Sequence, residues 1–232
     1  MVAGIFGCLY SRRSPSCTRL TLVLAHICED SELCRLNRAE ICIEDLSPDF
    51  TEVLELSARY ERVSGGAFSA RPAGRALDTN AIVKGWAVQR ASDILRAAGI
   101  LSFCFNAGGD VIVHGVPAAG RHWNVGVRSP ADPRAMLAVL SVTNAAVATS
   151  GTYERGSHIW DGTGAPARGL ISVTVVADDL VTADILATTV FALGPPGVGW
   201  AACEFDCRVL ALTEQDDILT GGDVESLLAT EE

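Results

Sequence analysis

The stretch "VTADILATTVFALG" (Val181–Gly194) predicts a helix of about three turns that is apolar enough for a protein core. Asp184 and Thr188 are four residues apart within it, so a helix places both on one face, one turn apart. A carboxylate and a hydroxyl in this arrangement are oxygen ligands of the kind that Mg²⁺ prefers. The alternative is purely structural, because the helix dipole favours aspartate near an N-terminus and Thr182 is a normal N-cap. Both interpretations stay open on this stretch alone.

Short β-rich runs surround this helix in the sequence. "GLISVTVVADD" leads directly into it, and "ILSFCFNAGGDVIVHG" predicts two strands joined by a tight turn at residues 106–110. "HWNVGVRSP" and "MLAVLSVTNAAVATSG" each alternate like a strand, and "CRVLALTEQDDILTGGD" predicts a closing hairpin.

Two further helices are predicted upstream of these strands. Residues 47–66 have Ser47 as N-cap, Pro48 at the first helical position and two glycines as a stop. In residues 75–99 the expected buried face consists of apolar residues: Ala87, Ala91, Ile94, Leu95 and Ala98. A cluster of helices, consecutive strands and one late helix is not the alternation of a parallel sheet. The sequence therefore predicts an α+β fold with antiparallel β-sheets and packed helices.

Composition limits the class of protein. The chain has 232 residues, of which 49% are hydrophobic and 20% charged, as in a globular protein. The formal net charge of −10 argues against a nucleic-acid surface. Eight cysteines show no C-x-x-C pair and no zinc spacing, so free thiols are expected. No apolar run is long enough for a transmembrane helix, and "MVAGIFGCLY" lacks the features of a signal peptide or lipobox, so we expect a cytoplasmic protein.

Three other segments carry more polar and glycine residues than their elements require. Residues 78–85 begin a helix that could bind an anion, with Lys84 near a phosphate; a capped helix with a solvated lysine is the alternative. The glycine pair in residues 106–110 permits close approach to a ligand or simply makes a hairpin. Residues 148–166 gather many functional groups between strands, as either a site or a polar hairpin.

These segments, in this order, resemble the ApbE family of FAD:protein FMN transferases. The matching parts are Asp78–Gly85, Gly108-Gly109-Asp110, Thr149–Arg155, His158–Gly164 and Ala183–Thr188, with "DSELCRLN" and "SGGAF" upstream. The resemblance covers residues 30–232, which we expect to form a single ApbE-like domain, and leaves residues 1–29 as an atypical N-terminal segment. It implies a Mg²⁺-dependent enzyme that cleaves FAD and attaches FMN through a phosphoester to a threonine of an acceptor flavoprotein, releasing AMP.

The resemblance also assigns residues to the site. It implies that Asp184, Thr188 and the backbone carbonyl of Ala81 bind Mg²⁺. FAD contacts are implied for a larger set: Asp78, Lys84, Gly108, Gly109, Asp110, Glu154, His158 and Ile159. His158 is the best candidate for proton transfer, with Asp161 or Asp184 as alternative bases, and Asp184 is counted with the catalytic residues.

Several positions depart from the family pattern. Ser69 stands where the family usually has aspartate, and Asp161-Gly162-Thr163-Gly164 is one residue shorter than the usual segment. These departures leave the metal ligands in place and bear on flavin affinity and turnover. Two alternatives therefore stay open: a metal-dependent FAD pyrophosphatase, and a flavin-binding protein without catalysis.

Overall fold

An antiparallel sheet of six strands forms the centre of the protein. The computed structural model describes residues 29–71, 75–132, 134–152, 159–161 and 163–229. The strands lie in the order β1-β2-β5-β6-β7-β8. Their bounds are β1 (Phe103–Ala107), β2 (Asp110–His114), β5 (Ala145–Gly151), β6 (Leu170–Ala177), β7 (Arg208–Thr213) and β8 (Ile218–Gly221). A separate two-stranded sheet pairs β3 (Trp123–Arg128) with β4 (Met136–Val142). The α+β class with antiparallel sheets is confirmed.

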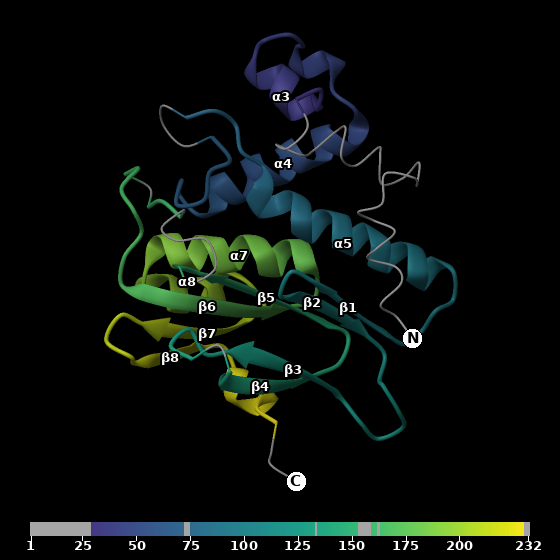
Figure 1. Cartoon of the computed structure of the whole chain (residues 1–232), viewed down its shortest axis with the longest axis vertical. Coiled ribbons are helices and arrows are strands. Elements are labelled where there is room, and N and C mark those ends of the chain that lie inside the picture. The colour runs from purple at the N-terminus through teal and green to yellow at the C-terminus, as the bar shows by residue number, and fades with distance from the viewer. Residues whose placement is uncertain (1–28, 72–74, 133, 153–158, 162, 230–232) are drawn as a thin grey trace.

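The helices lie on one face of the large sheet and the β3–β4 pair lies on the other (Figure 1). α7 packs directly on β5 and β6, α5 lies along α7, and α3 and α4 are farther from the sheet. The helices are α3 (Glu32–Asn37), α4 (Pro48–Val63), α5 (Asn80–Ala97), α7 (Leu180–Leu193) and α8 (Pro196–Glu204), with short 3-10 turns η1 (Ile43–Asp45) and η2 (Val224–Leu227). None of the helices in the described ranges is long and apolar enough to cross a membrane.

Alternation along the central strands divides the apolar core into two parts. Successive side chains of a strand point to opposite faces of the sheet. On β6, Val173 and Val175 join the core beneath the helices, whereas Val176 joins the smaller core under β3 and β4. β7 repeats the pattern, with Val209 on the helix side and Leu210 on the other. The helix-covered face is the one that carries the candidate site.

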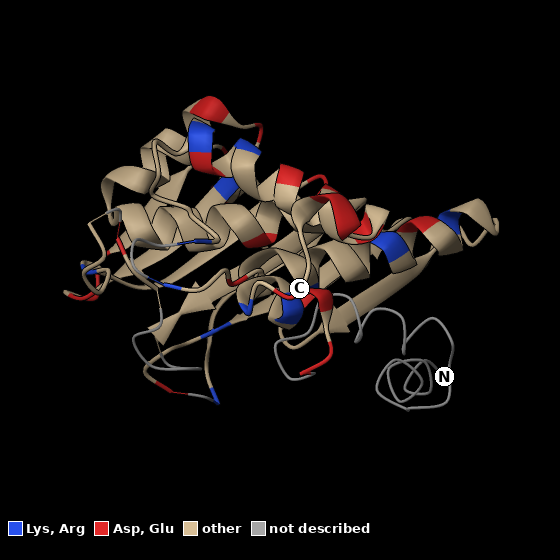
Figure 2. Ribbon diagram, turned by 90° about the horizontal axis from the view of Figure 1, so that it is seen from above, with Lys and Arg blue, Asp and Glu red and all other residues tan. Residues whose placement is uncertain are grey.

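Charged residues of both signs lie along the outer helices as well as in the loops (Figure 2). One cation links two of these helices: Arg90 of α5 pairs with Glu52 of α4 at 2.8 Å and with Asp49 at 3.4 Å. The same guanidinium lies 5.0 Å from the centre of the Trp86 ring. Because these pairs are exposed, each contributes little to stability.

The segment that leads into α5 is held by an asparagine side chain. Asn37, at the end of α3, donates from Nδ2 to the Leu77 carbonyl at 2.9 Å and accepts from the Leu77 N–H at 3.0 Å. Both polar groups of one backbone residue are thereby satisfied by a single side chain. Leu77 directly precedes Asp78, so Asn37 fixes the position at which the first site segment begins.

We expect Asn37→Ala to lower the free energy of unfolding by about 1–3 kcal/mol, because two backbone groups of a buried residue lose their partner. For a chain of this size the melting temperature should fall by about 2–4 °C for each kcal/mol. Thermal unfolding followed by circular dichroism measures this. Glu40→Ala, which breaks only the exposed pair with Arg38 at 2.6 Å, is the matched control and should leave the melting temperature nearly unchanged. Equal shifts of the melting temperature in the two variants would contradict the role of Asn37 in holding Leu77.

Three details of the predicted elements were wrong. The buried face of α5 consists of residues nearer its N-terminus, including Ile82 and Trp86, while the predicted Ile94 is 68% exposed and Ala98 is exposed. The last buried residues of α5 are Val88 and Ser92, so Ile94 lies on the other side of the helix, which faces outward. Ala87, Ala91 and Leu95 are half-buried against the core.

The predicted strand over residues 136–151 is two strands, β4 and β5, which belong to different sheets. The chain turns between them at Asn144, whose φ of 49° is a left-handed conformation that asparagine tolerates. The N-cap of α7 is Asp179 rather than Thr182. Its carboxylate accepts the Thr182 N–H at 2.8 Å and the Thr182 hydroxyl at 2.7 Å.

Candidate functional site

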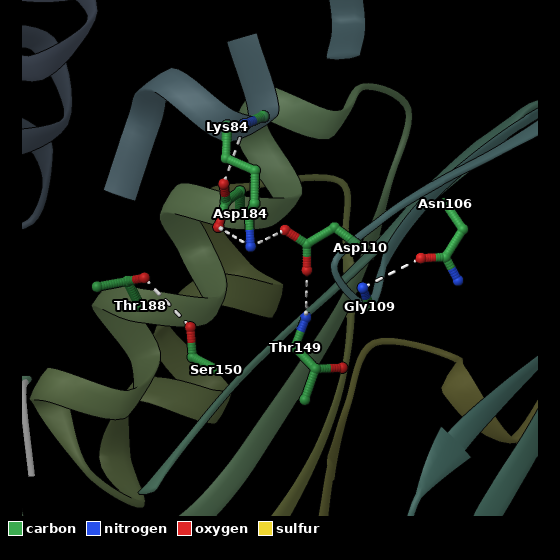
Figure 3. Close-up of polar contacts among 9 residues, drawn as sticks. Lys84, Asn106, Gly109, Asp110, Thr149, Ser150, Asp184 and Thr188 are labelled. Atoms are coloured by element: carbon green, nitrogen blue, oxygen red, sulfur yellow. Dashed lines mark hydrogen bonds and ion pairs between the residues drawn. The ribbon is translucent and has the colours of Figure 1, made fainter. Parts of the chain in front are cut away.

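Three charged side chains from distant parts of the chain meet on the helix-covered face of the sheet (Figure 3). The ammonium group of Lys84, on α5, forms an ion pair with Asp110 at the start of β2. It also lies 3.8 Å from Oδ1 of Asp184 on α7. Asp110 is 1% exposed and Asp184 5%, whereas the Lys84 side chain is 34% exposed. Lys84 is therefore not a solvated surface lysine, and two buried carboxylates share a cation that reaches the surface.

The turn between β1 and β2 places Asp110. Gly108 and Gly109 have φ values of 62° and 98°, a region that residues with a Cβ rarely adopt. The Asn106 side chain closes the turn by accepting the Gly109 N–H at 3.1 Å. Asp110 then begins β2 on the helix-facing side, where its Oδ1 accepts the Thr149 N–H at 3.3 Å. The glycines themselves are exposed. Their role here is to form the turn that directs Asp110 toward the helices.

Asp184 is held from the neighbouring helix. The backbone N–H of Gly85 on α5 donates to Oδ2 of Asp184 at 3.1 Å. A Cβ at Gly85 would lie only 2.8 Å from the Leu180 carbonyl oxygen and 3.1 Å from the Cβ of Asp184. Glycine is thus required because the two helices approach too closely at this point for any side chain.

Gly85→Ala should lower the free energy of unfolding by up to about 2 kcal/mol, because overpacking costs about 1–3 kcal/mol and the gain in helix propensity offsets about 1. The Leu180 carbonyl cannot rotate away, so Asp184 should shift and Mn²⁺ affinity, measured by calorimetry, should fall at least about tenfold. Gly199→Ala is the matched control. Gly199 lies inside α8, and no atom lies within 4 Å of the position that an added methyl group would take, so that variant should be slightly stabilised. Unchanged stability and metal affinity in Gly85→Ala would contradict the close-packing argument.

Thr188 continues the line of oxygen atoms along α7. It lies one turn after Asp184 and is half-buried, and its Oγ1 is 3.2 Å from the Ser150 hydroxyl of β5 (Figure 3). Ser150 had no role assigned from the sequence. The signal for it was the alternation of β5, because Ala146 and Ala148 face the helices and Ser150 follows on the same side.

The predicted ligands fit a hard cation. Asp184 and Thr188 offer a carboxylate and a hydroxyl on one helix face, the donor types that Mg²⁺ takes. Ala81 lies one turn before Gly85 on α5. In a regular helix the Gly85 N–H would donate to the Ala81 carbonyl, but this N–H also reaches Asp184. A carbonyl oxygen has two lone pairs. The Ala81 carbonyl, which shares its N–H partner with Asp184, can therefore also bind a cation.

Asp78 lies at the start of α5 and outside the charged cluster. It is exposed, and its Oδ1 accepts the Asn80 N–H at 2.9 Å while its own N–H donates to the Ala70 carbonyl at 2.7 Å. This contact orients the carboxylate just before the N-cap residue of α5, Thr79. A role in FAD binding stays a prediction.

The hairpin that contains Ile159 is held in shape by the carboxylate of Asp161. Ile159 is buried in the main core, and Oδ1 of Asp161 accepts the Thr163 hydroxyl at 2.6 Å and the backbone N–H groups of Thr163 and Ala165 at 2.8 and 3.0 Å. The Thr163 hydroxyl, followed by the Ala165 N–H, holds the pKa of Asp161 below its usual value. Asp161 is therefore a turn-forming residue and a weaker base than a free carboxylate.

A cation–aromatic contact joins this hairpin to the segment before α5. The Arg75 guanidinium lies 3.8 Å from the centre of the Trp160 ring. His158 and Glu154 lie outside the described residues, as do residues 1–28, so their predicted roles stay predictions. Of the predicted site residues, the structure brings together Lys84, Asp110, Asp184 and Thr188.

Comparison with known proteins identifies the family to which the chain is related. The ApbE family model matches residues 69–211. The chain is 33% identical over 153 residues to the FAD:protein FMN transferase of Vibrio cholerae, covering 61% of this chain and 46% of that protein. It is 35% identical over 170 residues to that of Rhodobacter capsulatus, covering 69% of this chain and 32% of that protein. The chain thus spans half or less of the length of these relatives.

Solved structures agree with the fold. The flavin transferase ApbE from Vibrio cholerae superimposes with a TM-score of 0.77 at 23% identity, covering 91% of this chain and 87% of that one. The apbe protein from Thermotoga maritima gives a TM-score of 0.78 at 22% identity, with coverage of 91% and 88%. The family model covers more than half of the sequence and the fold is shared. The chain belongs to the ApbE family.

Proposed function

We propose that this protein is a Mg²⁺-dependent FAD:protein FMN transferase. The observation that carries the proposal is the grouping of Asp184 and Thr188 on one face of α7 beside the ion pair of Lys84 and Asp110. The names of the relatives support the activity, and the donor set supports the metal. FAD is the substrate, and a flavoprotein with a reactive threonine is the partner.

The proposed reaction is a phosphoryl-type transfer. The oxygen of the acceptor threonine attacks the phosphorus on the FMN side of the FAD pyrophosphate and forms a new P–O bond. The P–O bond to the bridging oxygen breaks, and that oxygen leaves with AMP. The threonine proton passes to a base on the enzyme. Mg²⁺, when bound, would neutralise charge on the non-bridging oxygens of the pyrophosphate.

The residues of this chain have separate tasks in the proposal. Asp184, Thr188 and the Ala81 carbonyl hold the cation, and Gly85 fixes Asp184 in position. Lys84 is close enough to the surface to meet a phosphate, and Asp110 holds its ammonium group from below. In the proposal Asp78, Glu154 and Ile159 contact FAD, and His158 takes the proton.

A single incubation tests the activity. Purified protein, FAD and Mg²⁺ are mixed with a recombinant acceptor flavoprotein domain, and intact-mass spectrometry follows the acceptor. We expect the acceptor to gain the mass of FMN less one water, AMP to appear in equal amount, and a Thr→Ala acceptor to stay unlabelled. Free FMN without labelling would indicate the pyrophosphatase instead, and bound, unchanged FAD would indicate a non-catalytic flavin-binding protein.

A further inference from the structure

We infer that Lys84, held by the buried carboxylate of Asp110, acts as a tethered cation that competes with the divalent metal at the buried carboxylate of Asp184, and that the phosphates of FAD draw it away. The inference rests on the proposed function for the identity of the second ligand. Its first part concerns metal binding in the absence of flavin, so it can be tested by itself.

The distances set up the competition. The Lys84 ammonium lies 3.8 Å from Oδ1 of Asp184. Since Mg²⁺ binds oxygen at about 2.1 Å, a Mg²⁺ ion on that oxygen would lie no farther than about 6 Å from the ammonium. Repulsion between two cations at this separation is strong at the edge of a protein interior, where screening by water is incomplete. The ammonium must therefore move, or the metal binds less tightly.

Burial explains why the carboxylates need a resident cation. Asp110 and Asp184 are almost inaccessible to water, and unpaired buried charges are costly. Asp110 is also fixed in place by the Thr149 N–H, so it cannot follow a moving partner. Lys84 is the only lysine of the chain, and a third of its side chain is exposed. It can reach an incoming phosphate without leaving the site.

This arrangement predicts that FAD and the metal assist each other. A pyrophosphate gives Lys84 a new anionic partner. FAD binding should therefore reduce the repulsion between the ammonium group and the metal ion. Linkage requires that the metal raise FAD affinity by the same factor. Asp110 is then a positioning residue, which holds the Lys84 ammonium group where it can approach either Asp184 or a phosphate of FAD.

Mn²⁺ binding to the full chain without flavin tests the competition, with free Mn²⁺ measured by electron paramagnetic resonance. We expect Lys84→Met to bind Mn²⁺ at least about tenfold more tightly than the wild type. Arg90→Met is the matched control, because it removes one positive charge from the same helix away from the site, and it should bind as the wild type does. Equal or weaker binding by Lys84→Met, or no binding by either protein, would overturn the inference.

A second pair of variants guards against a folding defect in Lys84→Met, where two carboxylates lose their cation. Asp110→Asn leaves one cation with one carboxylate, and the double variant Lys84→Met/Asp110→Asn keeps the net charge of the cluster as it is in the wild type. The double variant should bind Mn²⁺ at least about tenfold more tightly than Asp110→Asn alone. No difference between these two would also overturn the competition.

Flavin fluorescence tests the coupling to FAD. We expect Mg²⁺ to lower the FAD dissociation constant of the wild type by a larger factor than that of Lys84→Met; equal factors would overturn the second part of the inference. If Lys84→Met binds Mn²⁺ more tightly but the wild type never labels an acceptor, the proposed transferase is refuted and the competition is supported. If the wild type labels an acceptor but Lys84→Met binds Mn²⁺ no more tightly than the wild type, the transferase is supported and the competition is refuted.

Discussion

Asp184→Asn should reduce the rate of Mg²⁺-dependent FMN transfer about a thousandfold or more while the protein stays folded. Metal stabilisation of a phosphoryl-type transition state supplies several kcal/mol, and each 1.36 kcal/mol corresponds to about a tenfold change in rate. Asparagine retains an oxygen that can accept the Gly85 N–H, which Asp184 accepts at 3.1 Å. Alanine would leave that buried N–H without a partner, so it would mix a folding defect with the loss of the metal.

The measurement is the single-turnover rate of acceptor labelling, together with Mn²⁺ affinity and melting temperature. Asp179→Asn is a suitable control on the same helix. It also removes one carboxylate charge, but asparagine is as good an N-cap as aspartate, so α7 and the transfer rate should be unaffected. Full Mg²⁺-dependent turnover by Asp184→Asn would show that Asp184 does not bind the metal.

His158→Ala should slow transfer by about 10²–10⁴-fold and leave the FAD dissociation constant nearly unchanged, as expected for loss of a general base. Transfer by the wild type should rise with pH as the base loses its proton, and in the variant this rise should disappear. The neighbouring Asp161 is poorly suited to the role, because its hydrogen bonds hold its pKa below the usual value.

Two measurements on the same variant separate catalysis from binding: the FAD dissociation constant and the single-turnover rate. Asp161→Asn provides the comparison, since asparagine can still accept the hydrogen bonds from Thr163 and Ala165. It should retain most of the transfer rate. Weakened FAD binding with an unchanged rate in His158→Ala would assign that residue to stacking or structure instead.

Local patterns in the sequence predicted those parts of the site that a single element creates. Helical spacing placed Asp184 and Thr188 on one face, and the glycine pair predicted the turn that begins β2. The α+β class followed from the order of helices and strands. These inferences depend on periodicity and turn chemistry, which act over a few residues.

Contacts between elements could not be predicted in the same way. The ion pair of Lys84 with Asp110 joins a helix to a strand, and no local pattern encodes their meeting. The buried face of α5 was wrong because Ile94, although it fits an apolar stripe, lies on the other side of the helix from the buried Ser92, and contacts with other elements decide which side is buried. Gly85 looked like an ordinary member of the first motif, and its need for glycine depends on the Leu180 carbonyl of another helix.

The two-sided sheet has a consequence for protein engineering. β3 and β4 are inserted in the sequence between β2 and β5, which nevertheless pair directly with each other. The hairpin covers only the face that bears Val147 and Val176, while Ser150 and Asp110 belong to the opposite face. A designer could therefore replace this hairpin with a new one, or graft a recognition loop at its tip, without changing a residue of the candidate site.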